Sequence, residues 1–293
     1  MARNDAPMDR GRGAGLEALA LRAIAGDEQA LFHALARRSR LPGPRADLAF
    51  AASFARECAA LGPAVDALAA RMATLDPDRY PGGTELEFLP ICGVLAVGAR
   101  AAAGSGERAR LLAVLHDAAE DLRWRVRDAV PEALAAVGAR SGDALVGEVA
   151  PWMRGFFHAA AVLRALARRE WLSALIDASG PLARLDEALA LAEEADRSSP
   201  RYPGYKALVD TVREVPPALA LRFGGEVLAR VARHTSAREP TLRAALASVA
   251  EHTALKRRFP TEMAVLVAAL KASEKPRRDP RTDVGPTRRR GKR

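Results

Sequence analysis

Residues 111–138 read LLAVLHDAAEDLRWRVRDAVPEALAAVG and contain two apolar stripes at helical spacing. The first stripe consists of three leucines, Leu111, Leu112 and Leu115. A polar break at Glu120–Asp121 follows. The second stripe recurs at positions i, i+4, i+8 and i+11, which are Val126, Val130, Leu134 and Val137. Gly138 is predicted to end the second helix. Two amphipathic helices joined this tightly form an antiparallel αα-hairpin, the building unit of helical solenoids.

The composition favours an all-α fold over any fold that contains a sheet. Of the 293 residues, 49% are hydrophobic but only 5% are aromatic, and Ala and Leu dominate the hydrophobic set. Ala and Leu are strong helix formers, whereas β-branched and aromatic residues favour strands. The sequence contains no run in which polar and β-branched apolar residues alternate. We therefore predict helices throughout, in a chain long enough to bury a substantial core.

Clusters of Gly, Pro and Asp divide the sequence into about fourteen helical segments with short connections. Pairing these segments gives about seven antiparallel pairs of about 35–40 residues, close to the period of known helical repeats. We predict that residues 15–272 form a single α-solenoid of such pairs. Residues 1–14 are rich in Gly, Arg and Asp, and residues 273–293 are rich in Arg and Pro, so both ends are predicted to be disordered.

The stretch 111–138 resembles the HEAT repeat, a family of antiparallel helix pairs stacked into superhelices. The residues that match the family pattern are Asp121, Val126, Arg127, Ala129, Leu134 and Gly138. Residues 227–250 match it more loosely, and residues 145–167 less again. The resemblance implies that Arg127 hydrogen-bonds carbonyl groups of the preceding helix pair. Pro131 departs from the pattern because it has no N–H for the Arg127 carbonyl, and we expect it to kink the second helix.

One four-residue sequence occurs twice, as RYPG at residues 79–82 and again at residues 201–204. Each copy is followed by helical segments, which is compatible with an old duplication and also with coincidence in a chain rich in Pro, Gly and Arg. Tyr80, Tyr202 and the nearby Tyr205 are predicted to lie in exposed turns. Aromatic residues in such turns are candidate anchors for a partner. Packing of each tyrosine against its own helix ends is the alternative.

No motif in the sequence indicates catalysis, a cofactor or a metal ion. None of the five histidines lies in an HExxH motif or four residues from another histidine, and no nucleophile elbow or phosphate-binding loop occurs. Cys58 and Cys92 lie in apolar helical contexts without a CxxC motif, which predicts buried free thiols in a reducing compartment. The start of the chain lacks the apolar segment of a secretory signal, and Arg100 interrupts the longest apolar run, Ile91–Ala103. We expect a cytoplasmic protein without a membrane span.

The formal charge of +9 comes from 45 basic and 36 acidic residues and is concentrated at the C-terminal end. Residues 274–293 contain nine basic and three acidic residues, a net charge of +6. Arg288, Arg289 and Arg290 are candidate contacts to nucleic-acid phosphates. A solubilising tail is the alternative. Only five of the basic residues are Lys, and this excess of Arg, together with many Ala and Gly, indicates a GC-rich bacterial genome.

These features favour a non-enzymatic scaffold that binds a partner protein on a solenoid surface. Trp124, Arg125 and Arg127, beside the predicted turn, join the tyrosines as candidate contacts. One alternative is a nucleic-acid-associated protein that uses the basic tail. Another follows from the resemblance, because some bacterial DNA glycosylases that remove alkylated bases are built from HEAT-like repeats and hold the duplex with Arg, Trp and Asp. Asp128 completes that set here, although the near-neutral body disfavours a large phosphate-binding surface.

Overall fold

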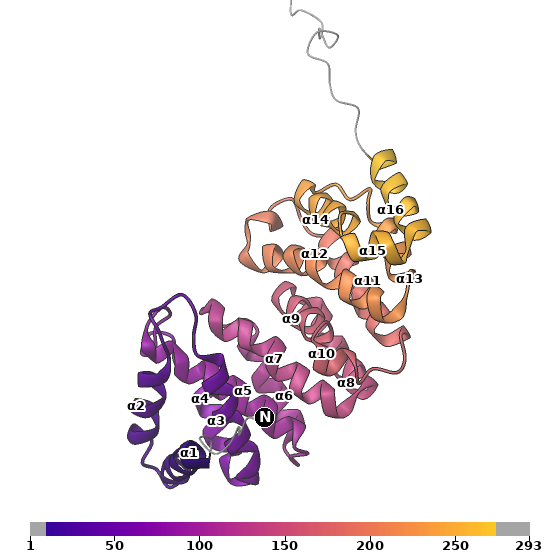
Figure 1. Ribbon diagram of the computed structural model, residues 1–293. Coiled ribbons are helices and arrows are strands. Elements are labelled where there is room, and N and C mark those ends of the chain that lie inside the picture. Colours follow the sequence, from indigo (N-terminus) through magenta and orange to yellow (C-terminus); the bar gives the residue numbers. More distant parts are fainter. Residues whose placement is uncertain (1–9, 274–293) are drawn as a thin grey trace, which may run out of the picture.

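The computed structural model describes residues 10–273, in which sixteen α-helices and four short 3-10 helices are the only regular elements (Figure 1). The prediction of an all-α fold is confirmed. The α-helices are α1 Arg10–Ile24, α2 Gln29–Arg38, α3 Leu48–Ala60, α4 Asp66–Ala73, α5 Phe88–Ala102, α6 Arg108–Ala118, α7 Trp124–Ser141, α8 Asp143–Glu148, α9 Phe156–Leu166, α10 Arg169–Leu172, α11 Ser179–Glu193, α12 Pro203–Phe223, α13 Glu226–Arg233, α14 Pro240–Ala250, α15 Thr253–Arg258 and α16 Pro260–Ser273. The 3-10 helices are η1 Gly62–Val65, η2 Glu85–Glu87, η3 Ala150–Arg154 and η4 Ser199–Arg201.

Six helices form a row in which each packs against the next, in the order α3, α5, α7, α9, α12 and α14. The helices α4 and α6 flank α5, α8 and α10 flank α7, and α11 lies against both α9 and α12. At the C-terminal end, α13, α14 and α15 all contact α16. Figure 1 shows that the chain passes through the molecule in sequence order, from α1 at one end to α16 at the other.

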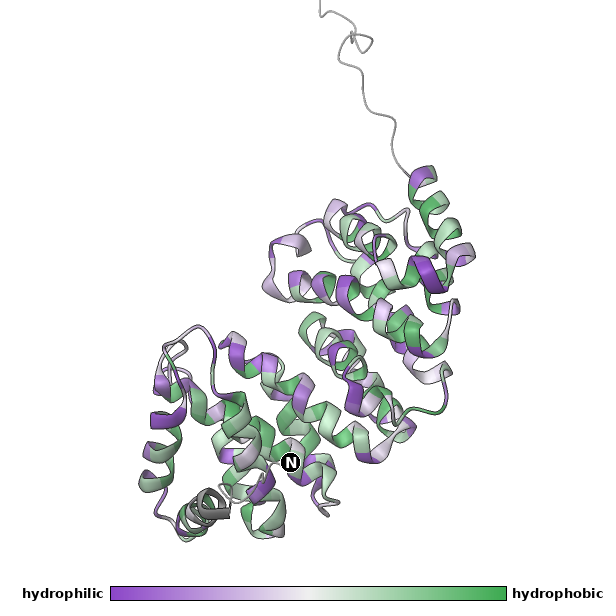
Figure 2. Cartoon of the chain, in the orientation of Figure 1, coloured by the Kyte–Doolittle hydropathy of each residue, from purple (hydrophilic) through white to green (hydrophobic). Residues whose placement is uncertain are grey.

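The helix α5 is buried on nearly all sides because α3, α4, α6 and α7 surround it. Its sequence, FLPICGVLAVGARAA, is accordingly apolar around the whole helix, as expected for a helix without a solvated face. Figure 2 shows hydrophobic residues concentrated where the helices meet. Cys92 on α5 and Cys58 on α3 are buried free thiols, as predicted. Burial raises the pKa of Cys58 to about 12 and the pKa of Cys92 well above its usual value, so both thiols stay protonated at neutral pH.

One buried charge on α5 is neutralised by the preceding helix. The Arg100 side chain is almost inaccessible, and its Nε donates to Asp66 Oδ1 at 2.6 Å. The hydroxyl of Ser105 donates to the other carboxylate oxygen of Asp66 at 2.7 Å. A second Arg100 nitrogen donates to the carbonyl of Ala59 at 3.2 Å. Charged groups tolerate burial only with such partners, so this network ties α3, α4 and α5 together.

Two glycines allow helices to approach more closely than any larger residue would permit. A Cβ at Gly98 would lie 2.6 Å from the Cα of Ala133 on α7, and a Cβ at Gly138 would lie 2.2 Å from the ring of Trp171 on α10. The prediction that Gly138 ends the helix is wrong, because this glycine makes room for Trp171 instead. The helix α7 continues to Ser141 and ends at Gly142, whose φ of +55° is left-handed.

Other helix boundaries also differ from the expectation. The helix α1 begins at Arg10, so the predicted disorder does not extend over residues 10–14, while residues 1–9 and 274–293 lie outside the described range. The structure has sixteen α-helices where about fourteen were predicted, and the short helices α8, α10 and α15 have six, four and six residues, too few for a periodic pattern to be recognised. The helix α7 continues through Pro131. Within residues 10–273, no helix has both the length and the hydrophobicity that crossing a membrane requires.

We predict that Gly98→Ala lowers the free energy of unfolding by about 1–3 kcal/mol, because the added methyl group forces α5 and α7 apart. Gly147→Ala is the matched control, since a Cβ there meets nothing within 4 Å and Ala is the better helix former by about 1 kcal/mol. Urea denaturation followed by circular dichroism measures both variants. Equal stability of the two variants would contradict the close helix contact.

Candidate interaction site

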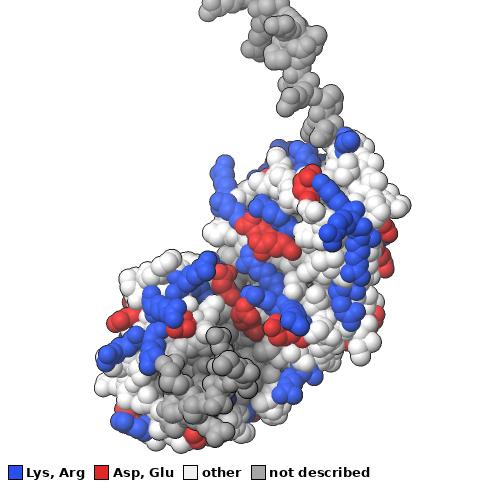
Figure 3. Space-filling view, in the orientation of Figure 1, with Lys and Arg blue, Asp and Glu red and all other residues white. Residues whose placement is uncertain are grey.

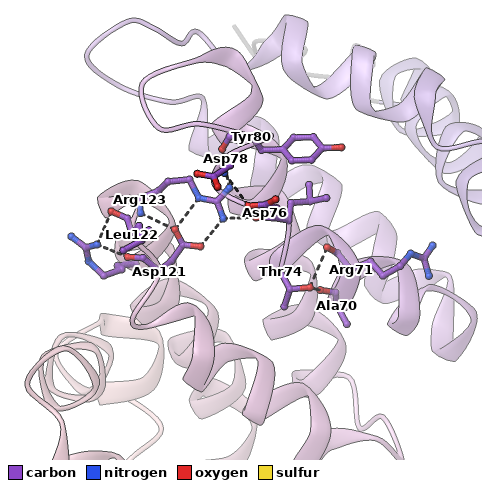
Figure 4. Close-up of polar contacts among 11 residues, drawn as sticks. Ala70, Arg71, Thr74, Asp76, Asp78, Tyr80, Asp121, Leu122 and Arg123 are labelled. Carbon is purple, nitrogen blue, oxygen red and sulfur yellow. Dashed lines mark hydrogen bonds and ion pairs between the residues drawn. The ribbon is translucent and has the colours of Figure 1, made fainter.

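The turn between α6 and α7 is held by Arg123, whose side chain is almost fully buried. Its guanidinium donates to the carbonyl oxygens of Leu75 at 2.7 Å and Tyr80 at 2.9 Å, which lie in the connection between α4 and α5. It also forms an ion pair with Asp121 at 2.6 Å. Figure 4 shows Arg123 reaching from its own turn toward that connection. Arg123 therefore joins the α6–α7 pair to the preceding helices.

Arg127 does not make the contact that the family resemblance implies. Its guanidinium donates to the carbonyl groups of Asp121 and Leu122, within its own turn, and lies 4.4 Å from the ring centre of Phe157 on α9. Burial lowers the pKa of Arg127 from its usual value. The prediction that Arg127 bonds to the preceding helix pair is therefore wrong. Arg123 makes that contact instead. The reason is that Arg127 lies within the first turn of α7, where its side chain faces the following helix.

Trp124 and Arg125 begin α7 and stack on each other, with the guanidinium 4.4 Å from the ring centre. Trp124 is 51% exposed and therefore accessible to a partner. Arg125 forms an ion pair at 3.0 Å with Glu87, which is fully buried and also accepts the N–H of Gly83 at 2.8 Å. Trp124 therefore lies at the surface, whereas the Arg125 guanidinium is held by the buried carboxylate of Glu87.

The three tyrosines lie in different environments. Tyr80 is half-buried and meets the ring of Phe32 edge-on, with 6.4 Å between ring centres. Tyr202 is 58% exposed directly before α12. Tyr205 is buried, its hydroxyl donates to the carbonyl of Ala192 at 3.4 Å, and burial raises the pKa of Tyr205 to about 12. The predicted exposure of Tyr205 is wrong, because the first turn of α12 directs this ring into the core.

Two adjoining cavities form a groove along α7, α9 and α12, which we call the central groove. Their volumes are ≈ 300 Å³ and ≈ 500 Å³. Asp128, Pro131 and Arg164 line both cavities, so the groove is continuous. Apolar contacts are offered by Phe157 in the smaller cavity and by Leu48, which is 49% exposed, in the larger one. The row of helices therefore presents a hollow of mixed polarity.

The charges that line the central groove balance. Its basic side chains are Arg127, Arg164, Arg168 and Lys206, and its acidic side chains are Asp128, Glu132, Asp210 and Glu214. Arg164 lies 3.5 Å from Asp128, and Arg168 forms an ion pair with Glu132. Figure 3 shows acidic and basic side chains mixed where the two halves of the molecule meet. Since these pairs are partly exposed, they are weak enough to exchange partners with a bound molecule.

Most residues of the central groove were missed by sequence reasoning. Asp128 and Arg127 were recognised from the resemblance, but Arg164 lies on α9, in a stretch that matches the repeat pattern poorly, and Arg168 lies in the connection between α9 and α10. The signal available for Arg164 was its helical spacing from Phe157, at i+7. That spacing shows that the two residues share one side of α9 but does not show which helices face it, and no periodicity locates Arg168, whose backbone is extended.

No family model, curated protein or solved structure matches this chain. Over residues 10–273, no group of three or more His, Cys, Asp and Glu side chains is arranged to hold a metal ion. The tail candidates Arg288, Arg289 and Arg290 lie outside the residues that the structure describes. The central groove and the charged surfaces are the features of the described residues that bear on function.

We predict that Arg123→Ala lowers the free energy of unfolding by about 3–5 kcal/mol, because it leaves Asp121 and two carbonyl groups without their buried partner. Arg110→Ala is the control, since Arg110 is exposed and its only ion pair, with Glu107, spans 3.8 Å. That change should stay within about 0.5 kcal/mol of the wild-type protein. Chemical denaturation compares the three proteins, and a small loss for Arg123→Ala would show that the turn is held by other contacts.

Proposed function

We propose that this protein is a non-enzymatic scaffold, a HEAT-like α-solenoid of antiparallel helix pairs that binds a segment of a partner protein in its central groove. We place it in the cytoplasm of a bacterium. The arrangement of the helices supports the solenoid, since the six helices of the row contact one another in sequence order and flanking helices lie beside them. The stretch 111–138 forms one such pair, α6 and α7, which pack together.

The observation that carries this proposal is the charge balance along a continuous groove. Four basic and four acidic side chains line it, and Asp128 and Arg164 lie where its two cavities join. A groove of zero net charge gains little from a uniformly charged polymer, because attraction at one position is offset by repulsion at the next. An extended peptide with both acidic and basic side chains complements it. Phe157 and Leu48 add apolar contacts for the side chains between those charges.

The exposed Trp124 lies on the same helix as this groove, one turn before Asp128. Tryptophan is frequent among the residues that contribute most binding energy at protein interfaces. Its ring is already held in place by stacking against Arg125, so binding orders it at little further entropic cost. These features favour Trp124 as the anchor at the entrance of the groove.

We predict that reversing two groove charges with Arg164→Glu and Arg168→Glu weakens partner binding at least about tenfold. The matched control is Arg110→Glu with Arg140→Glu, which changes net charge equally at exposed positions away from the groove. Affinity capture from the native host identifies the partner, and titration of the purified partner measures each affinity. Deletion of residues 274–293 should leave that affinity unchanged. An unaltered affinity in the groove variant would overturn the proposal.

A second candidate is a DNA glycosylase of the HEAT-like kind, and one observation favours it. Asp128 and Arg164 lie 3.5 Å apart in the groove, and the exposed Trp124 is one turn away from Asp128. These are the three residue types with which the DNA glycosylases built from HEAT-like repeats hold alkylated DNA. The balanced charge of the groove disfavours this candidate, since a duplex requires several phosphate contacts.

The glycosylase candidate predicts that the wild-type protein releases an alkylated base from duplex DNA and that Asp128→Asn abolishes the release. Asp210→Asn is the control, because Asp210 lines the same groove at α12, where it pairs with Arg213. Chromatography of the released bases provides the measurement. Absence of release by the wild-type protein would end this candidate and leave the scaffold proposal standing.

A further inference from the structure

The net charge of the chain is carried by its last quarter. Residues 226–293 contain a net charge of +10, whereas residues 1–225 have a net charge of −1. The tail accounts for +6 of this excess, and the helices α13–α16 with their connections account for the other +4. The positive charge of residues 274–293 therefore continues into the helices α13–α16.

Two of the four basic side chains of the central groove form ion pairs, Arg164 and Arg168, whereas only two of the eight on α13–α16 and their connections do. Of the eight, Arg230 pairs with Asp186 and Glu226, and Lys256 pairs with Glu251 at 2.7 Å. Within residues 10–273, the other six have no ion pair, and they are Arg233, Arg238, Arg243, Arg257, Arg258 and Lys271. Their positive field is thus available to an external anion.

The short helix α15 brings three of these cations together. Lys256, Arg257 and Arg258 form its exposed last turn, directly before α16. The helix α16 has fourteen residues and spans about 21 Å. Its last turn carries the exposed Lys271, after which the chain continues into the basic tail. On α13, which packs against α16, Arg233 is exposed as well. Figure 3 shows basic side chains gathered over these C-terminal helices.

We propose that this C-terminal basic surface, formed by Arg233, Lys256, Arg257, Arg258 and Lys271, binds the phosphodiester backbone of nucleic acid. About six phosphates of one DNA strand lie within the length of α16, since successive phosphates along a strand are separated by about 3.4 Å of axial rise. Arginine matches phosphate oxygens with two parallel hydrogen bonds, and three of the five cations are Arg. The surface is separate from the central groove, so this inference does not depend on the scaffold proposal.

Binding at this surface is independent of base sequence. Phe259 is the only Phe, Tyr or Trp among residues 226–273, and it is half-buried beneath Arg258, whose guanidinium lies 5.6 Å from the ring centre. Stacking of bases on exposed aromatic rings is therefore not part of the recognition. The contacts are to the backbone, and they weaken steeply as salt displaces the protein.

The test uses fluorescence anisotropy of a labelled 20-base-pair duplex with the full chain. The wild-type protein should bind at 50 mM salt and lose at least about tenfold in affinity at 200 mM salt. Arg257→Glu with Arg258→Glu should weaken binding at least about tenfold at 50 mM salt. Arg37→Glu with Arg45→Glu changes the net charge equally at exposed positions outside this surface and should weaken binding less than about threefold. Circular dichroism confirms that both variants are folded.

Further measurements distinguish binding at the C-terminal basic surface from binding by net charge alone, by the tail alone or to anionic lipid. A chain that ends at Ser273 should still bind the duplex, more weakly than the full chain, and should lose that residual binding with the Arg257→Glu and Arg258→Glu changes. Equal loss in the two charge-reversed variants would mean that only net charge matters, and loss confined to the tail deletion would assign binding to the tail alone. Either of these two results would overturn the proposal. So would failure of the wild-type protein to bind the duplex, and so would preferential binding to vesicles of anionic phospholipid.

Discussion

The contact between Gly98 on α5 and Ala133 on α7 sets the spacing at the centre of the molecule. The backbones meet there without an intervening side chain, so dispersion contacts extend along both helices. The helix α5 has no solvated face and depends on α3, α4, α6 and α7 to cover it. The other helices of the row also depend on contacts with their neighbours, because an amphipathic helix by itself leaves its apolar face uncovered.

Buried charges fix the relative positions of the packed helices. Apolar contacts allow neighbouring helices to slide or rotate at modest cost, whereas hydrogen bonds to a charged group have fixed geometry. Asp66 connects with Arg100 and Ser105 between α4 and the end of α5, and Arg123 connects the α6–α7 turn with the carbonyl groups that follow α4. The first network fixes α5 against α3 and α4. The second fixes the start of α7, and so the positions of Asp128, which lines the central groove, and of Trp124 one turn before it.

The charged residues divide the molecule into two surfaces with different properties. In the central groove, Arg164 and Arg168 lie beside Asp128 and Glu132, which leaves mixed charges at short range and no long-range field. At the C-terminal basic surface the cations outnumber their acidic neighbours, and the field adds to that of the tail. The first arrangement favours a partner with a matching pattern of both charges. The second favours a polyanion with evenly spaced phosphates, and the two proposed binding surfaces are separate from each other.

The all-helical fold and most of its breaks were predictable from sequence, because they follow from local properties. The high content of Ala and Leu, the two stripes in residues 111–138 and the Gly and Pro clusters each act over a few residues. The short helices α10 and α15 escaped this reasoning, since four or six residues are too few to show a period. Buried thiols at Cys58 and Cys92 were also predictable, because their neighbours in sequence are apolar.

What the tertiary structure alone decided is which distant residues meet. Gly138 has the sequence character of a helix stop, but it lies inside α7, where Trp171 packs against it from a position 33 residues later in the chain. Arg123 and Arg127 are equivalent in type, and only the direction of each side chain assigns the first to the preceding helices and the second to Phe157. Arg164 joins Asp128 in the groove for the same reason. Helical periodicity determines the face of a helix on which a residue lies, whereas the packing of the whole row determines what that face contacts.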